Sequence, residues 1–236
     1  MRCLVFNGWA AGLETWRLCT FPHDWVFDYV EQLDGLPEKM MDEFDEAVLV
    51  GFSMGGSTAL RMLLKYPEKV KGLVLISATP CMMEVKHRDT EAQRTDGTLC
   101  LCDSVFKTGC TGEWQGMSER RLAALRLGTQ MAFRDDPSPM YAVVNMERGL
   151  DYLRNTDLRA ELASYASCAS YASCIPVTIF QSERDGIVRP NNAEFLKGVF
   201  PQAKVTMVPG GEHVLPIAVP ELIDAAVEEI LTKGEP

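Results

Sequence analysis

The chain has 236 residues, 47% of them apolar, and a formal net charge of −10. A chain of this length can bury the core of one domain, and its negative charge argues against nucleic acid and anionic membrane surfaces as partners. It contains no apolar run of transmembrane length and no charged-then-apolar leader at its start, which predicts a cytoplasmic protein. We therefore expect its eight cysteines to be reduced rather than paired.

Short apolar runs alternate along the chain with helix-like stretches and with turns rich in Gly, Pro and Asp. This alternation is typical of an α/β fold, with a mostly parallel sheet of about six strands covered by helices on both faces. A helix-rich segment, 82–160, interrupts it and predicts an inserted helical cap between two core segments, 1–81 and 161–236. The expected strands are 2–6, 24–29, 46–51, 72–77, 176–181 and 203–208.

The third of these runs ends in a tight turn that carries a serine. Gly51-Phe52-Ser53-Met54-Gly55 fits the pattern G-x-S-x-G, and a helix-like run from Ser57 to Tyr66 follows it. Between a strand and a helix this pattern is typical of a nucleophile elbow, a strained turn that exposes the serine hydroxyl above the sheet edge. The pattern alone is only moderately specific, but its flanking elements make Ser53 the predicted nucleophile of a serine hydrolase.

Such a hydrolase needs a histidine base late in the chain, after an acidic residue. Of the three histidines, His23 precedes the elbow and His87 follows it with no strand between them. His213 comes after the last expected strand and a Pro-Gly-Gly turn, where the chain order requires the base. We therefore predict that His213 accepts the proton of Ser53, although a lone histidine is more often structural or merely exposed.

The acidic partner of the histidine is expected in the loop after the strand at 176–181. Asp185 precedes Gly186 and two apolar residues, which can exclude water and leave its charge to stabilise an imidazolium. Glu183 lies in the same loop and is the competing carboxylate, with a solvated loop position as its plainer interpretation. Asp185 is the predicted orienting residue.

Two backbone N–H groups should stabilise the negative charge that develops on the substrate oxygen. The residue after the nucleophile, Met54, supplies one of them. The loop after the first strand, Asn7-Gly8-Trp9-Ala10, is expected to supply the other through Trp9, whose indole would then cover the acyl site. The plainer interpretation of Trp9 is an ordinary buried tryptophan after a turn.

Several stretches match the motifs of one known family. They are Asn7-Gly8-Trp9 with Trp16, Gly51 to Gly56, Tyr66 to Val70 with Leu73 to Ile76, Ser77 to Cys81, Gly149 to Leu153 with Thr156 to Arg159, Asp185 to Val188, and the loop that carries His213. Together they resemble the α/β-hydrolase superfamily and, within it, the biotin-pathway carboxylesterases. Asn7 departs from that pattern by replacing a histidine, and Arg189 departs by separating Val188 from Pro190.

The resemblance implies cofactor-free hydrolysis of the methyl ester of a pimeloyl group linked to acyl carrier protein. Because such a carrier is itself acidic, docking it on this acidic chain requires a local basic patch. The expected cap offers Arg120 and Arg121, followed by Arg126, Arg134, Arg148 and Arg154, although a solvated helix face is the plainer interpretation of these residues. Methionines of the same segment can line an acyl pocket or simply pack helices. Those that we expect at the substrate are Met82, Met117 and Met131.

Two further features of the sequence have plain interpretations. Cys100, Cys102 and Cys110 are close together, but their spacing does not fit a zinc site, so no metal is predicted. The hexapeptide at 163–168 is repeated at 169–174, just before the fifth expected strand. We expect this duplication to be a surface connection, because lengthening a loop costs little free energy.

Other functions fit the same residues. One alternative is a general esterase of short or medium acyl chains, and another is a carbon–carbon hydrolase or lyase on the same scaffold, such as the menaquinone-pathway enzyme. A third is a binding protein of hydrolase fold that turns over little. Labelling by an organophosphate separates the last from the first two, because only an activated serine reacts.

Overall fold

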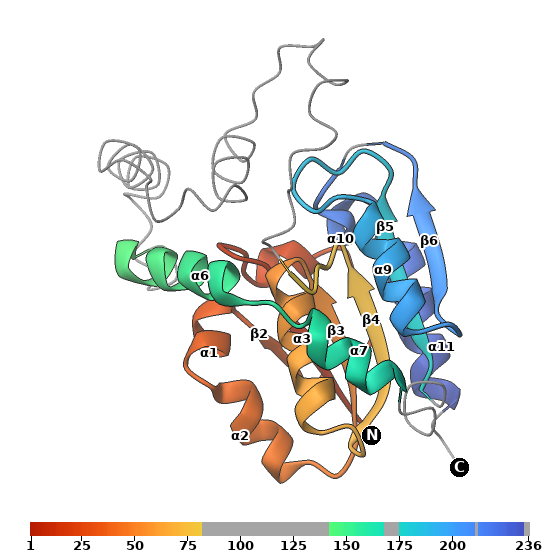
Figure 1. The fold of residues 1–236 in the computed structure, drawn as a ribbon, viewed down its shortest axis with the longest axis horizontal. Helices are drawn as coiled ribbons and strands as arrows, with labels where there is room; N and C mark the ends of the chain where they lie inside the picture. Colours follow the sequence, from red (N-terminus) through yellow and green to blue (C-terminus); the bar gives the residue numbers. More distant parts are fainter. Residues whose placement is uncertain (82–141, 168–174, 211, 234–236) are drawn as a thin grey trace.

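The computed structural model describes residues 1–81, 142–167, 175–210 and 212–233. Its centre is a six-stranded sheet with the order β2-β1-β3-β4-β5-β6, in which every neighbouring pair is parallel (Figure 1). All six predicted strands are confirmed, with no end displaced by more than two residues. They are β1 (Arg2–Phe6), β2 (Trp25–Phe27), β3 (Ala47–Phe52), β4 (Val70–Ile76), β5 (Val177–Ser182) and β6 (Lys204–Val208).

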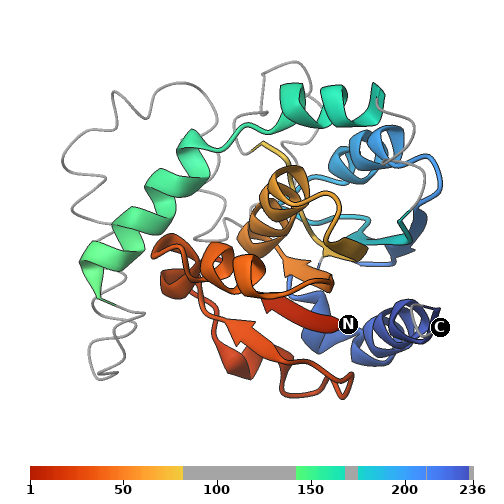
Figure 2. The ribbon, with the colours of Figure 1, turned by 90° about the horizontal axis from the view of Figure 1, so that it is seen from below.

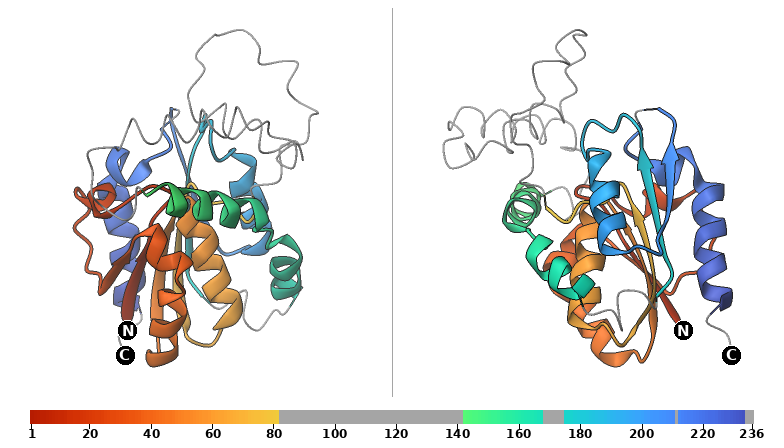
Figure 3. Two further views of the ribbon diagram at one scale, coloured as in Figure 1. Left: turned by 90° about the vertical axis from the view of Figure 1, so that its left-hand side faces the viewer. Right: turned by 45° about the vertical axis from the view of Figure 1, so that its right-hand side comes forward.

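Helices cover both faces of this sheet (Figure 3). One face carries α1 (Tyr29–Leu33), α2 (Leu36–Glu43), α3 (Met54–Lys65), α7 (Arg159–Ser167) and α9 (Asn191–Val199). The other carries the 3₁₀ turn η1 (Leu13–Trp16), α10 (Leu215–Ala218) and α11 (Pro220–Lys233). A further helix, α6 (Val143–Asn155), packs along α1 (Figure 2). Among the described helices, none combines the length and the apolar character needed to cross a bilayer.

The alternation of side chains along the strands explains the two layers. In β1, Leu4 and Phe6 join the core beneath α3, whereas Cys3 and Val5 join the core beneath α11. Successive side chains of a strand point to opposite faces, so a strand that is apolar at every position must be buried on both. The continuous apolar runs of the sequence therefore become interior strands of a sheet with two covered faces.

The order of the strands defines a position at their carboxyl ends where open α/β sheets bind ligands, which we call the crevice. The chain leaves β1 toward η1 on one face, whereas it leaves β3 toward α3 on the opposite face. Because β1 and β3 are neighbours, their carboxyl ends form the topological switch point at which open α/β sheets bind ligands. Trp9 follows β1 and Ser53 follows β3, so both flank this crevice.

The prediction of a surface connection for the duplicated hexapeptide was wrong for part of its first copy. Residues 163–167 belong to α7, and the second copy lies outside the described residues. Leu162 is fully buried, and Tyr165, one helical turn further on, packs its ring 6.1 Å from that of Phe200. Side chains three residues apart share one face of a helix, and this packing makes the segment helical.

Candidate active site

Ser53 lies in a strained turn between β3 and α3. Its backbone has φ 54° and ψ −118°, a combination that a residue with a side chain rarely adopts, and its N–H donates to the carbonyl of Ile76 at 2.9 Å. The glycines around it have no space for a side chain. A Cβ on Gly51 would lie 2.6 Å from the carbonyl oxygen of Gly55, and one on Gly56 would lie 2.3 Å from Cβ of Ala78. This close packing holds the elbow in its strained form.

Gly55→Ala should destabilise the protein strongly. A Cβ at this position would lie 2.2 Å from the carbonyl oxygen of Phe6, a backbone atom that cannot rotate away. We expect urea denaturation to show a loss of about 3 kcal/mol in the free energy of unfolding. Gly198→Ala in α9 is the control, because its Cβ meets nothing within 4 Å and alanine is the better helix former by about 0.5–1 kcal/mol. Equal stability of the two variants would contradict the prediction.

Ser53, Asp185 and His213 are brought together from three distant parts of the chain. The Oγ atom of Ser53 lies 3.0 Å from Nε2 of His213, and Nδ1 of that histidine lies 2.8 Å from Oδ2 of Asp185. The side chain of His213 is 14% exposed, whereas that of Asp185 is completely buried. The three loops that carry these residues follow β3, β5 and β6 at the same edge of the sheet. The distances fit a chain of hydrogen bonds from carboxylate to imidazole to hydroxyl.

Backbone donors hold the carboxylate of Asp185 in place. Its Oδ1 accepts the N–H groups of Ile187 at 2.8 Å and Val188 at 3.0 Å, while its Oδ2 faces the histidine and also accepts from Gln181 Nε2 at 3.4 Å. The buried side chain of Gln181 donates to the carbonyl of Val188 at 2.9 Å and fixes the same loop. Glu183, the competing carboxylate, is exposed. Asp185 is therefore the acidic residue that contacts the histidine.

The loop of His213 has supports that the sequence analysis missed. The hydroxyl of Ser77 donates to the carbonyl of His213 at 3.0 Å, and the ring of Phe52 lies 5.2 Å from the imidazole. Ser77 has a positive φ of 45°, directly after β4. The sequence signal that could have identified Ser77 was its position directly after a central strand. Of the other histidines, His23 is exposed and its Nδ1 lies near the carbonyl of Phe21, while His87 lies outside the described residues.

Two backbone N–H groups lie beside the serine. Met54 is the first residue of α3, where an N–H has no acceptor within its own helix. The loop after β1 passes so close that a Cβ on Gly8 would lie 3.1 Å from Cβ of Ser53. Within the described segments, neither Trp9 nor Met54 donates its backbone N–H to a carbonyl. Both groups are therefore available to an oxygen atom at the crevice.

Asn7 fixes the beginning of the Trp9 loop. This fully buried side chain donates through Nδ2 to the carbonyl of Phe27 at 3.0 Å and accepts at Oδ1 from the indole of Trp16 at 2.7 Å. The amide of Gln32 donates to the backbone carbonyl of Asn7 at 2.9 Å. Buried polar groups are stable only when they are hydrogen-bonded in this way. An asparagine can therefore pin this loop at the position where the resembling family has a histidine.

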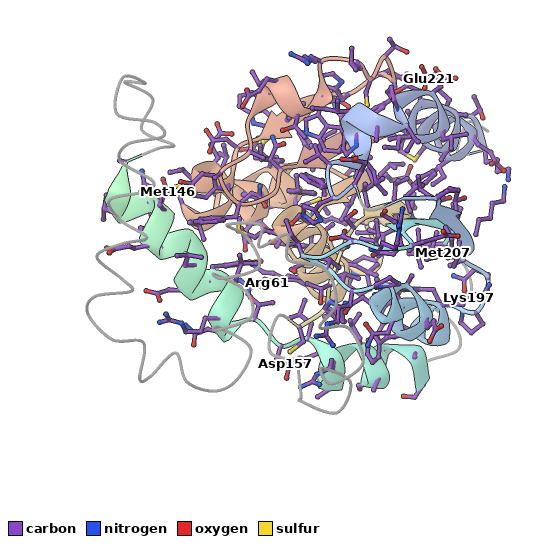
Figure 4. All side chains as sticks on the ribbon, turned by 90° about the horizontal axis from the view of Figure 1, so that it is seen from above. Arg61, Met146, Asp157, Lys197, Met207 and Glu221 are labelled. Carbon is purple, nitrogen blue, oxygen red and sulfur yellow. The ribbon has the colours of Figure 1, made fainter. Side chains whose placement is uncertain are left out.

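An apolar cluster lies beneath α6, next to the crevice. Met146 projects from α6 (Figure 4) and is buried with Tyr29, Met54 and Leu153, while Trp9 packs against the same group. Met54 joins this cluster to the elbow. The other substrate contacts predicted from the sequence lie outside the described residues, namely Met82, Met117, Met131, Arg120 and Arg121.

A separate cavity of about 310 Å³ opens between α1, α3 and α6. Arg61 on α3 (Figure 4) lines it. Its guanidinium lies 4.6 Å from the centroid of the Tyr152 ring. Arg61 is about two helical turns beyond Ser53, and none of Ser53, Asp185 and His213 lines the cavity. This cavity is therefore distinct from the crevice that holds the hydrogen-bonded Ser53, His213 and Asp185.

Among the described residues, no group of three His, Cys, Asp or Glu side chains is placed to hold a metal ion. Within the described residues, Cys3 and Cys19 are free thiols. The three cysteines whose spacing we considered for zinc, Cys100, Cys102 and Cys110, lie outside the described residues.

Comparison with solved structures supports the fold. A bromoperoxidase from Bacillus anthracis superimposes with a TM-score of 0.61 over 98% of this chain and 91% of its own, at 18% identity. A thermophilic esterase gives a TM-score of 0.60 over 98% and 90%, at 16% identity. The model of the alpha/beta hydrolase fold family matches residues 10–98. The chain therefore has the predicted α/β-hydrolase fold.

Relatives found by sequence identify the family more narrowly than the solved structures do. The pimeloyl-[acyl-carrier protein] methyl ester esterase of Yersinia enterocolitica is 30% identical over 191 residues, which cover 77% of this chain and 68% of the relative. The protein of the same name from Edwardsiella ictaluri is 29% identical over 252 residues, which cover 96% and 91%. The chain therefore belongs to the pimeloyl-[acyl-carrier protein] methyl ester esterase family of α/β hydrolases and is itself a hydrolase.

Proposed function

We propose that this protein is a serine esterase that hydrolyses the methyl ester of a pimeloyl group carried by acyl carrier protein, a step of biotin synthesis. The observation that carries the proposal is the unbroken set of hydrogen bonds from Asp185 through His213 to Ser53, at 2.8 and 3.0 Å. The names of the relatives from Yersinia enterocolitica and Edwardsiella ictaluri support the choice of ester.

In the first half of the reaction, Ser53 Oγ attacks the ester carbonyl carbon and its proton moves to His213 Nε2. The carbonyl oxygen becomes an oxyanion and accepts the N–H groups of Trp9 and Met54. When the tetrahedral intermediate collapses, the bond to the methoxy oxygen breaks and His213 returns the proton to it. Methanol leaves, and the pimeloyl group remains bound to Ser53 as an acyl ester.

In the second half, water attacks the acyl carbon and gives a proton to His213. Collapse of the second tetrahedral intermediate breaks the bond to Ser53 Oγ, which recovers its proton from the histidine. The product is the free carboxylate of the carrier-bound pimeloyl group. Asp185 stays ionised throughout, holds the ring with Nδ1–H toward itself, and stabilises the imidazolium that forms in both halves.

We further propose that residues 82–160 form a cap over this site and that 1–81 and 161–236 form the core. The support comes from α6, which belongs to the proposed cap and packs on α1 and on Trp9. The proposed boundary after residue 160 falls inside α7, which begins at Arg159. The last residues of the cap therefore continue into a core helix without a break.

An acidic carrier needs basic residues on the enzyme, whose net charge is −10. The arginines of α6 and α7 do not meet this need, because carboxylates already neutralise them. Arg148, Arg154 and Arg159 form ion pairs with Asp34, Asp151 and Asp157, respectively. The proposal of carrier docking therefore rests on the other arginines of the proposed cap, Arg120 and Arg121 together with Arg126 and Arg134.

The test is methanol release from pimeloyl-carrier methyl ester, measured beside p-nitrophenyl butyrate and with a Ser53→Ala variant. Turnover of the carrier ester that requires Ser53 is the expected result. Turnover of the small ester alone would replace the proposal by a general carboxylesterase. A wild-type protein that hydrolyses neither ester and is not labelled by an organophosphate would instead be a ligand-binding protein of hydrolase fold.

A further inference from the structure

We propose that α6 positions the oxyanion donor of this site and that Gly149 is the residue through which it does so. In this arrangement the Trp9 backbone N–H points at the reacting oxygen only while the Trp9 indole is docked against α6. The inference rests on the proposed ester hydrolysis by Ser53. The inference gives α6 a positioning role, although Ser53, Asp185 and His213 all lie elsewhere in the chain.

A hydrogen bond ties the Trp9 loop to α6. The indole Nε1 of Trp9 donates to the backbone carbonyl of Met146 at 3.1 Å, across 137 positions of the sequence. The indole is joined to the backbone of Trp9 through only two rotatable bonds, so anchoring the ring on α6 restrains the position of the Trp9 backbone and of its N–H. Beyond Trp9, Ala10 has a positive φ of 55°. A residue with a side chain keeps such a conformation only where its surroundings hold it there.

Gly149 gives the indole its place on the helix. A Cβ at this position would lie 2.5 Å from Cδ1 and 2.9 Å from Nε1 of Trp9, and 3.2 Å from Cε2 of Tyr29. Glycine in the middle of a helix is unfavourable, and the backbone here has an ordinary helical φ, so close approach is the physical reason for it. The Cδ1–Nε1 edge of the ring approaches α6 at its one residue that has no side chain.

The helix is itself fixed to the elements that build the site. The hydroxyl of Tyr29 on α1 bonds to Sδ of Met146 at 3.2 Å, and the hydroxyls of Thr58 on α3 and Tyr152 on α6 lie 3.1 Å apart. Because α3 begins at the elbow, these two contacts give α6 a defined position relative to Ser53. The Trp9 loop is thus held by Asn7 on one side and by α6 on the other.

The test compares Gly149→Ala with Gly198→Ala, a helical glycine whose added Cβ meets nothing within 4 Å. With p-nitrophenyl butyrate, Gly149→Ala should lower kcat by about 10- to 100-fold, less than the roughly 100- to 1000-fold loss when an oxyanion donor is removed. KM should change by less than about threefold, because the donor acts in the transition state. The affinity for a trifluoromethyl ketone, whose adduct with Ser53 carries an oxyanion, should fall in parallel with kcat. Gly198→Ala should match the wild type in all three quantities.

A double variant separates this contact from general damage to the helix. Trp9→Ala removes both the indole N–H and the ring atoms that the new Cβ would strike. It should therefore show its own loss of kcat and of inhibitor affinity, and adding Gly149→Ala to it should change neither further. If the two losses multiply instead, Gly149 acts elsewhere and the inference is wrong.

The remaining outcomes are also decisive. Wild-type-like kcat and inhibitor affinity in Gly149→Ala would overturn the inference while leaving the esterase in place. If circular dichroism shows that Gly149→Ala does not fold, Trp9→Ala alone decides, and an unchanged kcat there would overturn the inference. If the wild-type protein shows no turnover that depends on Ser53, the proposed function fails first, and the inference fails with it.

Discussion

Ser53→Ala should lower kcat for ester hydrolysis by about 10⁴- to 10⁶-fold. The variant removes the atom that attacks the ester, whereas the backbone donors and the histidine remain. Its fold should be unchanged, because the hydroxyl of Ser53 bonds only to His213 among the described residues. The measurements are steady-state hydrolysis of p-nitrophenyl butyrate and thermal unfolding of the same preparation.

Organophosphate labelling is the control for Ser53→Ala. The wild-type protein should take up one equivalent at Ser53, and the variant should take up none. Residual activity in the variant that an organophosphate still abolishes would reveal a contaminating hydrolase. Residual activity near the wild-type level with no labelled protein in the sample would contradict the assignment of Ser53 as nucleophile.

Asp185→Asn should lower kcat by about 10⁴-fold with little change in KM. Oδ1 of Asp185 accepts two backbone N–H groups, from Ile187 and Val188. The amide oxygen of an asparagine must take this position, so its NH₂ group faces Nδ1 of His213. The imidazole is then forced into the tautomer with its proton on Nε2. That nitrogen donates to Ser53 instead of accepting its proton, and the base is lost.

Glu183→Gln is the matched control for Asp185→Asn. It makes the same chemical change two residues away, at an exposed carboxylate that does not contact the histidine. We expect its kcat to stay within about twofold of the wild type, as for most exposed substitutions. Equal losses in the two variants would mean that the charge of the whole loop matters rather than the hydrogen bond to His213. No loss in Asp185→Asn would remove Asp185 from the mechanism.

The local pattern of the sequence was sufficient for the framework of the site. Each of Ser53, Asp185 and His213 follows an apolar run that forms a strand in the structure. In a parallel sheet the carboxyl ends of all strands meet at one edge, so three positions far apart in the sequence are necessarily close in space. The role of the glycines around Ser53 could also be predicted from the sequence, because an elbow between a strand and a helix leaves no space for side chains.

The duplicated hexapeptide shows where local pattern was insufficient. Its place before a predicted strand and the low cost of lengthening a loop favoured a surface connection, yet the first copy continues helix α7 as far as Ser167. The deciding contact is that of Tyr165 with Phe200, which belong to segments separated by the whole of β5 and α9. Packing against a distant segment outweighs the intrinsic preference of a short stretch.

The sequence by itself determined the α/β class, the six strands, and the candidates Ser53, Asp185 and His213, because these follow from local periodicity and chain order. Only the tertiary structure decided that Asp185 rather than Glu183 reaches the histidine, that Ser77 supports the His213 loop, and that Asn7 pins the Trp9 loop. It also brought Gly149 against Trp9. These are contacts between side chains and backbone atoms far apart in the sequence, which local patterns do not encode and only the completed packing of the helices on the sheet defines.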